Sequence, residues 1–472
     1  MLARLLKVLL LAALVLMIGS LRSSIAPSTP ENLEISEPAP SDDVGQIHAI
    51  EASATGEIWV VGETRSKPTK GLIARRYGTE WKKEASLSIA GGDHRLYDIT
   101  ILSPNDIWAV GEYVIDPKTA RALVVHWDGA EWKVVTGIDT GPGNNGLHAI
   151  TAVAPDDIWV GGWSFQEGRS PGGQSLILHW NGETWSNTPL LGGTHHTIND
   201  LSAVSADDVW AVTLNVIFHW DGQIWSEAHR AVDPGGIFGK PNLVGVEAIS
   251  EQDVWVVGSS YWAGGCDHGE AHILHWDGYT WSSVPIPAID FECIGPPSLA
   301  DIHALAPDDI WAVGAGLNRP MAMHWDGTTW SLNACPEVGL AGRESRGGLV
   351  GVTGAEGKIW IAGESVVRSE NLSPPSGKVL VKQPFIMRPY QGVCPTPTPP
   401  PTPIPQPQIF VPPVLPEMPD PVRTDIAQPV PTISVPDAIE TNMAVIRTAT
   451  AVAVDATQTR STPLPSPTSP LP

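Results

Sequence analysis

A six-residue phrase centred on tryptophan recurs seven times and constrains the fold of this chain more than any other feature. Successive copies are 45 to 56 residues apart. A repeat of this length that contains only strand signals is typical of the blades of a β-propeller. The copies read EIWVVG, DIWAVG, DIWVGG, DVWAVT, DVWVVG, DIWAVG and KIWIAG, with their tryptophans at Trp59, Trp108, Trp159, Trp210, Trp255, Trp311 and Trp360.

A second phrase follows most copies of the first and predicts a β-hairpin. It reads RYGTEW in the first repeat, then HWDGAEW, HWNGETW, HWDGQIW, HWDGYTW and HWDGTTW. An Asp-Gly pair between apolar, aromatic arms predicts a two-residue hairpin turn. Each repeat then holds four strands, which in the third copy cover residues 147–153, 158–162, 175–180 and 184–188. Because one blade cannot bury its own faces, we predict an all-β, seven-bladed propeller of four-stranded antiparallel blades.

The seventh repeat departs from the others, because KVLVKQPFIMRPY stands where the hairpin phrase is expected. The alternating segment Asn32–Ser36, NLEIS, is a candidate for the outer strand of that blade.

The two phrases resemble the repeats D-[IV]-W-[AV]-V-G and H-W-D-G-x-x-W of bacterial extracytoplasmic β-propellers, many of which have no defined function. The resemblance covers about Ile47 to Tyr390 and implies a propeller fold. The hairpin is also similar to the Asp-box (BNR) motif of sialidase-type propellers. It departs from that motif because Asp and Gly are adjacent here, whereas one residue separates them in the Asp-box. The resemblance therefore implies the fold and carries no activity with it.

Composition divides the chain into four segments. Residues 1–26 place Arg4 and Lys7 before the uncharged apolar run Val8–Leu21, which predicts a signal peptide or an N-terminal anchor. Residues 27–45 are a predicted linker, 46–394 the propeller, and 395–472 a Pro/Thr/Ala-rich tail that is predicted to be disordered. We therefore expect an extracytoplasmic protein, with two alternatives open: secretion after cleavage of the signal, or attachment to a membrane or envelope at the cell surface through an uncleaved N-terminus.

Charge and cysteine content restrict the partners. Lys and Arg total 28 against 51 Asp and Glu, a formal net charge of −23 that repels phosphate backbones and argues against nucleic-acid binding. Four cysteines in an exported chain predict two disulfides, with three pairings open. We expect Cys266 to pair with Cys293 and Cys335 with Cys394, in a monomeric protein.

Residues that recur in every blade are expected to build the blade, so the search for a site concerns the exceptions. Eighteen of the twenty tryptophans occupy the two phrases. The other two fall between the second and third strands of a repeat, on the face that carries the variable loops. Aromatic side chains there suit a sugar ring or a protein partner, although they could also cover apolar surface beneath the loops. The predicted ligand-binding residues are Tyr113, Trp163, Phe165, Tyr261 and Trp262.

Acidic residues alternate with the core residues of the inner strands and are expected to face the central channel. Two interpretations stay open: a cation site, with Ca²⁺ as the candidate ion, or solvated acids in a water-filled channel, of which we favour the second. The channel acids are Glu51, Asp98, Asp200, Glu247 and Asp301.

A second candidate metal site lies in CDHGEAH, with His268 and His272 as the ligands. The competing interpretation is that Cys266 forms a disulfide and His272 begins a strand. Apart from these metal candidates, no cofactor is expected.

These features favour a binding module that presents its variable-loop face to a glycan or protein. Two alternatives remain: a glycan-active enzyme of the sialidase-like propeller type, and a passive envelope scaffold. Sialidases need an arginine triad and a nucleophilic tyrosine near the channel. Tyr97 is the one tyrosine that the sequence places on an inner strand, and no arginine is expected at the inner-strand positions.

Overall fold

The computed structural model describes residues 43–388, apart from 79, 88, 90–91, 117, 142, 166–172, 191–195, 232–240, 261–269, 288–296, 317–318, 333–345 and 369–379. The chain divides into two units, Met1–Pro397 and Thr398–Pro472, and the second lies wholly outside the described residues. All regular elements in the described part are β-strands. Within that part, no helix is long and apolar enough to cross a membrane.

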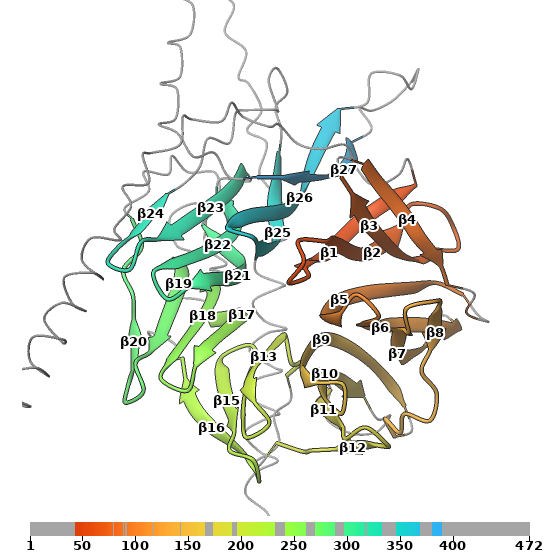
Figure 1. Cartoon of the computed structure of the whole chain (residues 1–472), viewed down its shortest axis with the longest axis horizontal. Helices are drawn as coiled ribbons and strands as arrows, with labels where there is room; N and C mark the ends of the chain where they lie inside the picture. The colour runs from red at the N-terminus through yellow and green to blue at the C-terminus, as the bar shows by residue number, and fades with distance from the viewer. Residues whose placement is uncertain are drawn as a thin grey trace, which may run out of the picture. The chain divides into compact units, whose positions relative to one another are not determined.

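Seven antiparallel sheets form seven blades, numbered here in chain order (Figure 1). Blades one to three contain β1 (Val44–Ala52), β2 (Ile58–Thr64), β3 (Gly71–Tyr77), β4 (Glu80–Ser86); β5 (His94–Ser103), β6 (Asp106–Asp116), β7 (Thr119–Trp127), β8 (Trp132–Val134); and β9 (Asn144–Ala154), β10 (Asp157–Phe165), β11 (Gln174–Trp180), β12 (Trp185–Asn187).

Blades four to six repeat this order, and blade seven has three strands among the described residues. They contain β13 (Asp200–Ser205), β14 (Asp208–Val212), β15 (Val216–Trp220), β16 (Trp225–Arg230); β17 (Pro241–Ser250), β18 (Asp253–Ser260), β19 (Glu270–Trp276), β20 (Trp281–Ser283); β21 (Ser298–Ala306), β22 (Asp309–Gly316), β23 (Arg319–Trp325), β24 (Trp330–Leu332); and β25 (Arg346–Ala355), β26 (Lys358–Arg368), β27 (Leu380–Met387).

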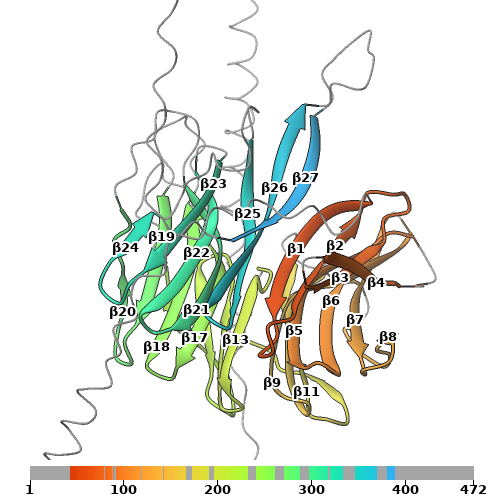
Figure 2. The same cartoon turned by 45° about the horizontal axis from the view of Figure 1, so that its top comes forward.

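The first strand of each blade is the innermost, and neighbouring inner strands contact each other around the whole ring, from β1 through β25 and back to β1. Figure 2 shows the strands of each blade side by side in twisted sheets. The predicted seven-bladed all-β propeller is therefore confirmed.

The hydrophobic core is divided among the interfaces between blades. Seven clusters of buried residues each join two adjacent blades. The cluster that joins blade seven to blade one includes Ile47, Leu72, Trp360 and Ile386, so the ring is closed by apolar packing. Burying a side chain of this size contributes about 1.5–3 kcal/mol, which explains why a blade needs two neighbours.

The recurring His and Asp of blades two to six are in contact in all five blades, and the Trp donates to the same Asp in blades two, three, five and six. In blade three, Asp157 Oδ1 lies 2.7 Å from His179 Nε2 and accepts a hydrogen bond from Trp159 Nε1 at 2.9 Å. The Trp159 and His179 rings stack with their centroids 4.1 Å apart. The same stacking recurs in blades two, four and five, and in blade six the Trp311 and His324 rings are tilted with their centroids 4.6 Å apart. These residues hold the second and third strands of their own blade together, which is a structural role.

The two tryptophans of the hairpin phrase contact the preceding blade. Trp159 of blade three meets Trp220 and Trp225 of blade four at centroid distances of 5.1 and 5.6 Å. Trp255 of blade five meets Trp325 and Trp330 of blade six in the same way. The phrase recurs because each copy completes an interface between blades.

The hairpin turn is longer than the sequence predicts. Trp276 pairs with Trp281, so four residues, Asp277 to Thr280, connect the strands instead of the predicted two. Asp277 Oδ1 accepts hydrogen bonds from the backbone N–H groups of Tyr279 and Thr280 at 2.9 and 2.8 Å. This side-chain acceptor stabilises the wider turn, and Gly278 at φ 88° supplies the left-handed conformation that it needs.

The glycine that ends the tryptophan phrase allows a close approach of two strands. A Cβ on Gly162 would lie 2.0 Å from the carbonyl oxygen of Gly146 on the inner strand. Gly111 and Gly258 are in the same position against Arg95 and Asn242. In all three blades a β-bulge in the inner strand lies next to this contact. Blade four has Thr213 in place of the glycine, and its inner strand β13 begins only at Asp200, beyond the contact.

Arginine replaces histidine in blades one and seven, the two blades that meet where the ring closes. Arg75 lies over the ring of Trp59 at 5.1 Å and is paired with Glu57. Trp360 has Arg388 of its own blade at 5.5 Å and Arg76 of blade one at 4.3 Å. The second contact provides a cation–π interaction between the two blades that close the ring.

Candidate binding site at the channel mouth

The variable-loop face is the face at which the inner strands begin and the second strands end. Three of the predicted ligand-binding residues lie on this face, but the structure places them within strands and not in loops. Tyr113 is in β6, and Trp163 and Phe165 are in β10. In blade three, strand pairing continues beyond Gly162, the glycine that ends the tryptophan phrase, because the inner strand β9 extends as far as β10. Trp163 therefore pairs with Gly146 of β9 and with Ser175 of β11. Tyr261 and Trp262 lie outside the described residues.

Tyr113 is also less available than predicted. It is half-buried and packs against the apolar cluster between blades one and two. Its ring therefore has a role in the core, which sequence position alone did not reveal.

The bulges of the inner strands distinguish one side of the channel from the other. The bulged residue is His48, Tyr97 or His148 in blades one to three, and Val244, Ala300 or Val350 in blades five to seven. Repeat geometry explains the bulge but not the aromatic residues in three consecutive blades.

The three aromatic bulge residues form a continuous row, called here the aromatic arc. The His48 and Tyr97 ring centroids are 5.0 Å apart, and those of Tyr97 and His148 are 4.7 Å apart. Since the three residues lie on consecutive inner strands, the arc runs around the channel near its mouth. All three side chains are partly exposed.

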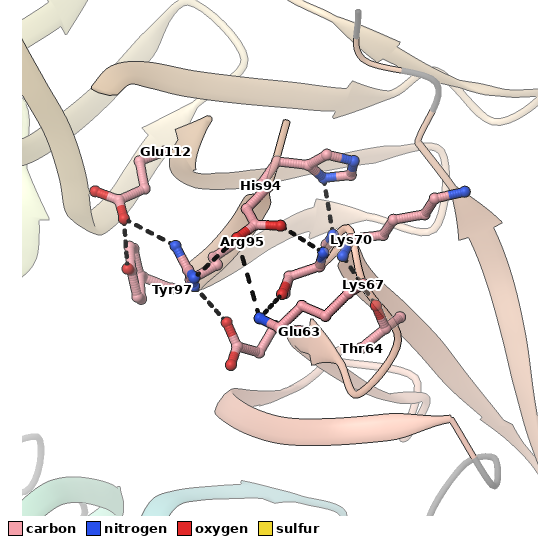
Figure 3. A network of polar contacts seen from close by, with 11 residues as sticks. Glu63, Thr64, Lys67, Lys70, His94, Arg95, Tyr97 and Glu112 are labelled. Atoms are coloured by element: carbon pink, nitrogen blue, oxygen red, sulfur yellow. Dashed lines mark hydrogen bonds and ion pairs between the residues drawn. The ribbon is translucent and has the colours of Figure 1, made fainter. Parts of the chain in front are cut away.

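A network of charged residues adjoins the arc between blades one and two (Figure 3). The Arg95 side chain lies 2.5 Å from Glu63, 3.5 Å from Glu112 and 3.8 Å from Asp93. The Tyr97 hydroxyl donates a hydrogen bond to Glu112 Oε1 at 3.0 Å. Arg95 is on the inner strand β5, which corrects the expectation that no arginine occupies these strands. The network fixes Tyr97 in the arc and places three carboxylates around one guanidinium.

Trp163 adds a second aromatic side chain in blade three, next to the strand that carries His148. A Cβ on Gly146 would lie 2.9 Å from Trp163 Nε1 and 3.0 Å from Glu112 Oε2. The Trp163 indole and the Glu112 carboxylate therefore both lie close to Gly146, and a larger residue at position 146 would displace them. The structure thus brings the predicted residue Trp163 next to the charged network, which links it to the arc through Glu112.

Burial favours the neutral forms of two residues of the arc, Tyr97 and His148. Desolvation lowers the pKa of His148, which favours the uncharged imidazole. The pKa of Tyr97 is raised, first by burial and then by the negative charge of Glu112, which favours the protonated phenol. Neutral rings edged by hydrogen-bonding groups suit stacking on a sugar or an aromatic side chain.

The aspartates of the channel join neighbouring blades. Asp98 accepts hydrogen bonds from its own neighbour Ile99 and from Ile150 of the next blade, both at 2.8 Å. Asp200 does the same between blades four and five, and Asp301 between blades six and seven. The odd-numbered blades have Ala or Gly at this position, so the aspartates alternate with small residues around the ring.

A second layer of the channel makes similar bonds with other residues. Glu247 Oε1 accepts the N–H of Ala304 at 3.2 Å, between blades five and six. Thr353 Oγ1 accepts the N–H of Ala52 at 3.0 Å, where blade seven meets blade one, and lies 3.4 Å from Glu51. The five predicted channel acids therefore lie on inner strands, and four of them accept hydrogen bonds from backbone N–H groups of the next blade.

The channel acids hold their protons more tightly than exposed acids do. Burial raises the pKa of Asp98, Glu247 and Asp301 to about 7. The pKa values of Glu51 and Asp200 are raised well above their usual range by burial and by the other channel carboxylates. The Glu247 side chain is nevertheless 24% exposed. Burial lowers the pKa of His303, which lies beside it.

These shifts predict that the ring is more stable at mildly acidic pH. Between the unfolded pKa near 4 and the folded pKa of about 7, the folded state binds more protons, so stability falls as pH rises. We expect the melting temperature to fall between pH 5 and 8, and less steeply in Glu247→Gln, which keeps the acceptor oxygen. Thermal melting of the unmodified protein and of Glu247→Gln between pH 5 and 8 tests this prediction. An equal dependence of melting temperature on pH in the two proteins would contradict it.

Other predicted sites receive no support from the described residues. No group of three or more His, Cys, Asp or Glu side chains there is arranged to hold a metal ion. His272 lies in β19, whereas His268 and the four cysteines fall outside the described residues, so both disulfides stay predictions.

The comparisons with known proteins find similar folds. No protein-family model and no curated protein matches the chain. YCF48 bound to a D1 peptide is 15% identical, with 77% of this chain and 99% of that chain covered and a TM-score of 0.46. A six-bladed fungal lectin from Aleuria aurantia, described with a fucose recognition mode, is 16% identical over 63% and 96% of the chains, with a TM-score of 0.41.

A third similar structure is the extracellular domain of a hybrid two-component system of B. thetaiotaomicron. It is 10% identical over 75% of this chain and 39% of that chain, with a TM-score of 0.47. Values this low carry no argument about a ligand. The assignment of a seven-bladed β-propeller rests on the strands and their pairing, and the candidate site rests on its own geometry.

Proposed function

We propose that this protein is an exported or cell-surface binding module that holds a glycan or a protein ligand at the channel mouth of its variable-loop face. The observation that carries the proposal is the aromatic arc. His48, Tyr97 and His148 interrupt a seven-fold repeat in three adjacent blades, whereas Val244 and Val350 occupy the same bulge on the other side. Residues that depart from the repeat are not required by the blade structure, so they are the residues that we expect at a binding site.

The groups around the arc favour a role in ligand binding rather than a purely structural role. Glu63 and Glu112 offer carboxylate acceptors at its edge, and Trp163 adds an indole that is partly exposed. Aromatic faces beside hydrogen-bonding groups are the usual means of recognising sugar rings and of anchoring protein partners.

A glycan-cleaving enzyme is the second candidate, because Tyr97, which lies on an inner strand, donates a hydrogen bond to Glu112. Two observations weigh against it. The raised pKa of Tyr97 disfavours the phenolate that would act as a nucleophile. Arg95 is already paired with Glu63, Glu112 and Asp93, so its charge is not available to a substrate carboxylate.

The extracytoplasmic location, attachment through the N-terminus and the monomeric state belong to the same proposal and rest on the sequence. A Ca²⁺ ion in the channel also stays a prediction. The backbone bonds accepted by Asp98, Asp200 and Asp301 already give these carboxylates a structural role.

The proposal is tested by applying fluorescently labelled full-length protein to printed arrays of glycans and of peptides. We expect saturable binding to one class of probe that unlabelled protein competes away. Retention of no glycan or peptide above the level of heat-denatured protein would contradict a binding module. Release of product from a fluorogenic sialoside, lost in Tyr97→Phe, would instead support the enzyme.

A further inference from the structure

Glu112 lies close to two aromatic side chains of the candidate site. Its Oε1 atom accepts the hydrogen bond of the Tyr97 hydroxyl at 3.0 Å (Figure 3). Its Oε2 atom lies toward Trp163, because a Cβ on Gly146 would be 3.0 Å from that oxygen and 2.9 Å from Trp163 Nε1. The Glu112 side chain is 14% exposed and both aromatic side chains are partly exposed, so a ligand can reach all three.

The nearby cations do not fully offset the carboxylates of this network. Arg95 is shared by three carboxylates and lies closest to Glu63, at 2.5 Å, whereas Glu112 is 3.5 Å away. Lys67, which is 74% exposed, lies 4.0 Å from Asp93. Three carboxylates therefore share two cations, and Glu112 has the longer of the two contacts with Arg95. Part of its negative charge stays available to a ligand.

The negative charge of Glu112 extends to two rings of the aromatic arc. The pKa of Tyr97 is raised first by burial and then by this charge. The pKa of His148 is lowered by burial, and the charge of Glu112 acts against that shift. Both effects have the sign of a negative potential, which favours a positive charge beside the rings.

We propose that the aromatic arc and Glu112 bind a positively charged lysine or arginine side chain of a protein partner. This inference rests on the proposed function and names the ligand class of that site. A cation within about 6 Å of an aromatic ring centroid is attracted by the ring, and a partly buried carboxylate beside the ring adds a charged hydrogen bond. A neutral sugar gains only the hydrogen bond, and an anion is repelled by Glu63 and Glu112.

The extent of the arc favours a side chain on a polypeptide over a small amine. The ring centroids of His48, Tyr97 and His148 are separated by 5.0 and 4.7 Å, and the three residues lie on consecutive inner strands. One residue of an extended peptide covers about 3.3 Å. Residues on either side of the lysine or arginine can therefore lie along the same row of rings.

Peptide arrays printed in matched pairs test the requirement for charge. Each peptide that contains lysine or arginine is printed beside the same sequence with Nε-acetyl-lysine or citrulline, which removes the charge and keeps a side chain of similar length. We expect the full-length protein to bind the charged member of a retained pair about tenfold more tightly. For the lysine peptide retained best, isothermal titration should show weaker binding as NaCl rises from about 50 mM to about 500 mM.

Two variants test whether Glu112 supplies the selection. Glu112→Gln keeps an acceptor oxygen and removes the charge, so affinity for the lysine peptide should fall about fivefold, with a smaller preference over the acetylated peptide. Gly146→Ala changes no charge but displaces Glu112 or Trp163, so it should weaken binding too. Glu227→Gln is the matched control, because it removes a carboxylate that also pairs with an arginine, on the outer strand β16 of blade four, and should leave affinity unchanged.

The outcomes separate this inference from the proposed function. Equal binding of charged and uncharged peptides, or retention of glycans but of no peptide, would overturn the cationic ligand and leave a binding module in place. Lysine binding that is unchanged in both Glu112→Gln and Gly146→Ala would also overturn it, because the cation would then lie elsewhere. Retention of neither glycans nor peptides would instead contradict the binding module. If one variant does not fold, as judged by its melting curve, the peptide pairs and the other variant still decide.

Discussion

Replacing Trp159 or Trp255 by alanine is expected to lower the free energy of unfolding by about 3–5 kcal/mol. Both side chains are at most 2% exposed. Each stacks on a histidine of its own blade and packs against two tryptophans of the next. Truncation therefore leaves a cavity at an interface between blades. Thermal melting followed by circular dichroism measures the loss.

Trp163→Ala provides the matched comparison, because it removes an indole from the same strand as Trp159. Trp163 is partly exposed at the channel mouth, so the fold should lose little. If it contacts the ligand, its removal should cost about 2 kcal/mol or more of binding free energy. A melting temperature as low as that of Trp159→Ala would show that Trp163 is a core residue and would remove it from the site.

Gly162→Ala is expected to destabilise the fold by about 3 kcal/mol, although only one methyl group is added. The new Cβ would lie 2.0 Å from the Gly146 carbonyl oxygen and 2.8 Å from Leu147 Cα, so two strands of blade three must separate. Gly348→Ala is the control, since its Cβ would meet the Ala315 methyl at 3.2 Å and no other atom closer than 3.9 Å. Equal melting temperatures for the two variants would contradict the close approach.

The repeat predicted the fold because each of its residues has a local task. Trp159 marks the second strand, His179 marks the third, and the spacing of the copies gives the number of blades. The turn length was mispredicted because Asp277 stabilises a four-residue connection through its side chain, which the Asp-Gly pair alone does not indicate.

The site was predicted only in part, for a physical reason. Trp163 could be identified as an exception to the repeat, and the channel acids followed from alternation along the strands. The arc was not predicted, because a bulge shifts His48 and His148 out of that alternation, and their contacts with Tyr97 cross between blades. Aligning the seven inner strands would have shown three aromatic residues at one position, which is the signal that was missed.

The most direct test of the binding site compares ligand affinity at one bulge position on opposite sides of the channel. Isothermal titration of the ligand retained on the arrays should show weaker binding by about 2 kcal/mol for Tyr97→Ala. Val350→Ala, which truncates the equivalent residue of blade seven, should keep the affinity of the unmodified protein. Unchanged affinity in Tyr97→Ala, with folding intact, would contradict a site at the aromatic arc.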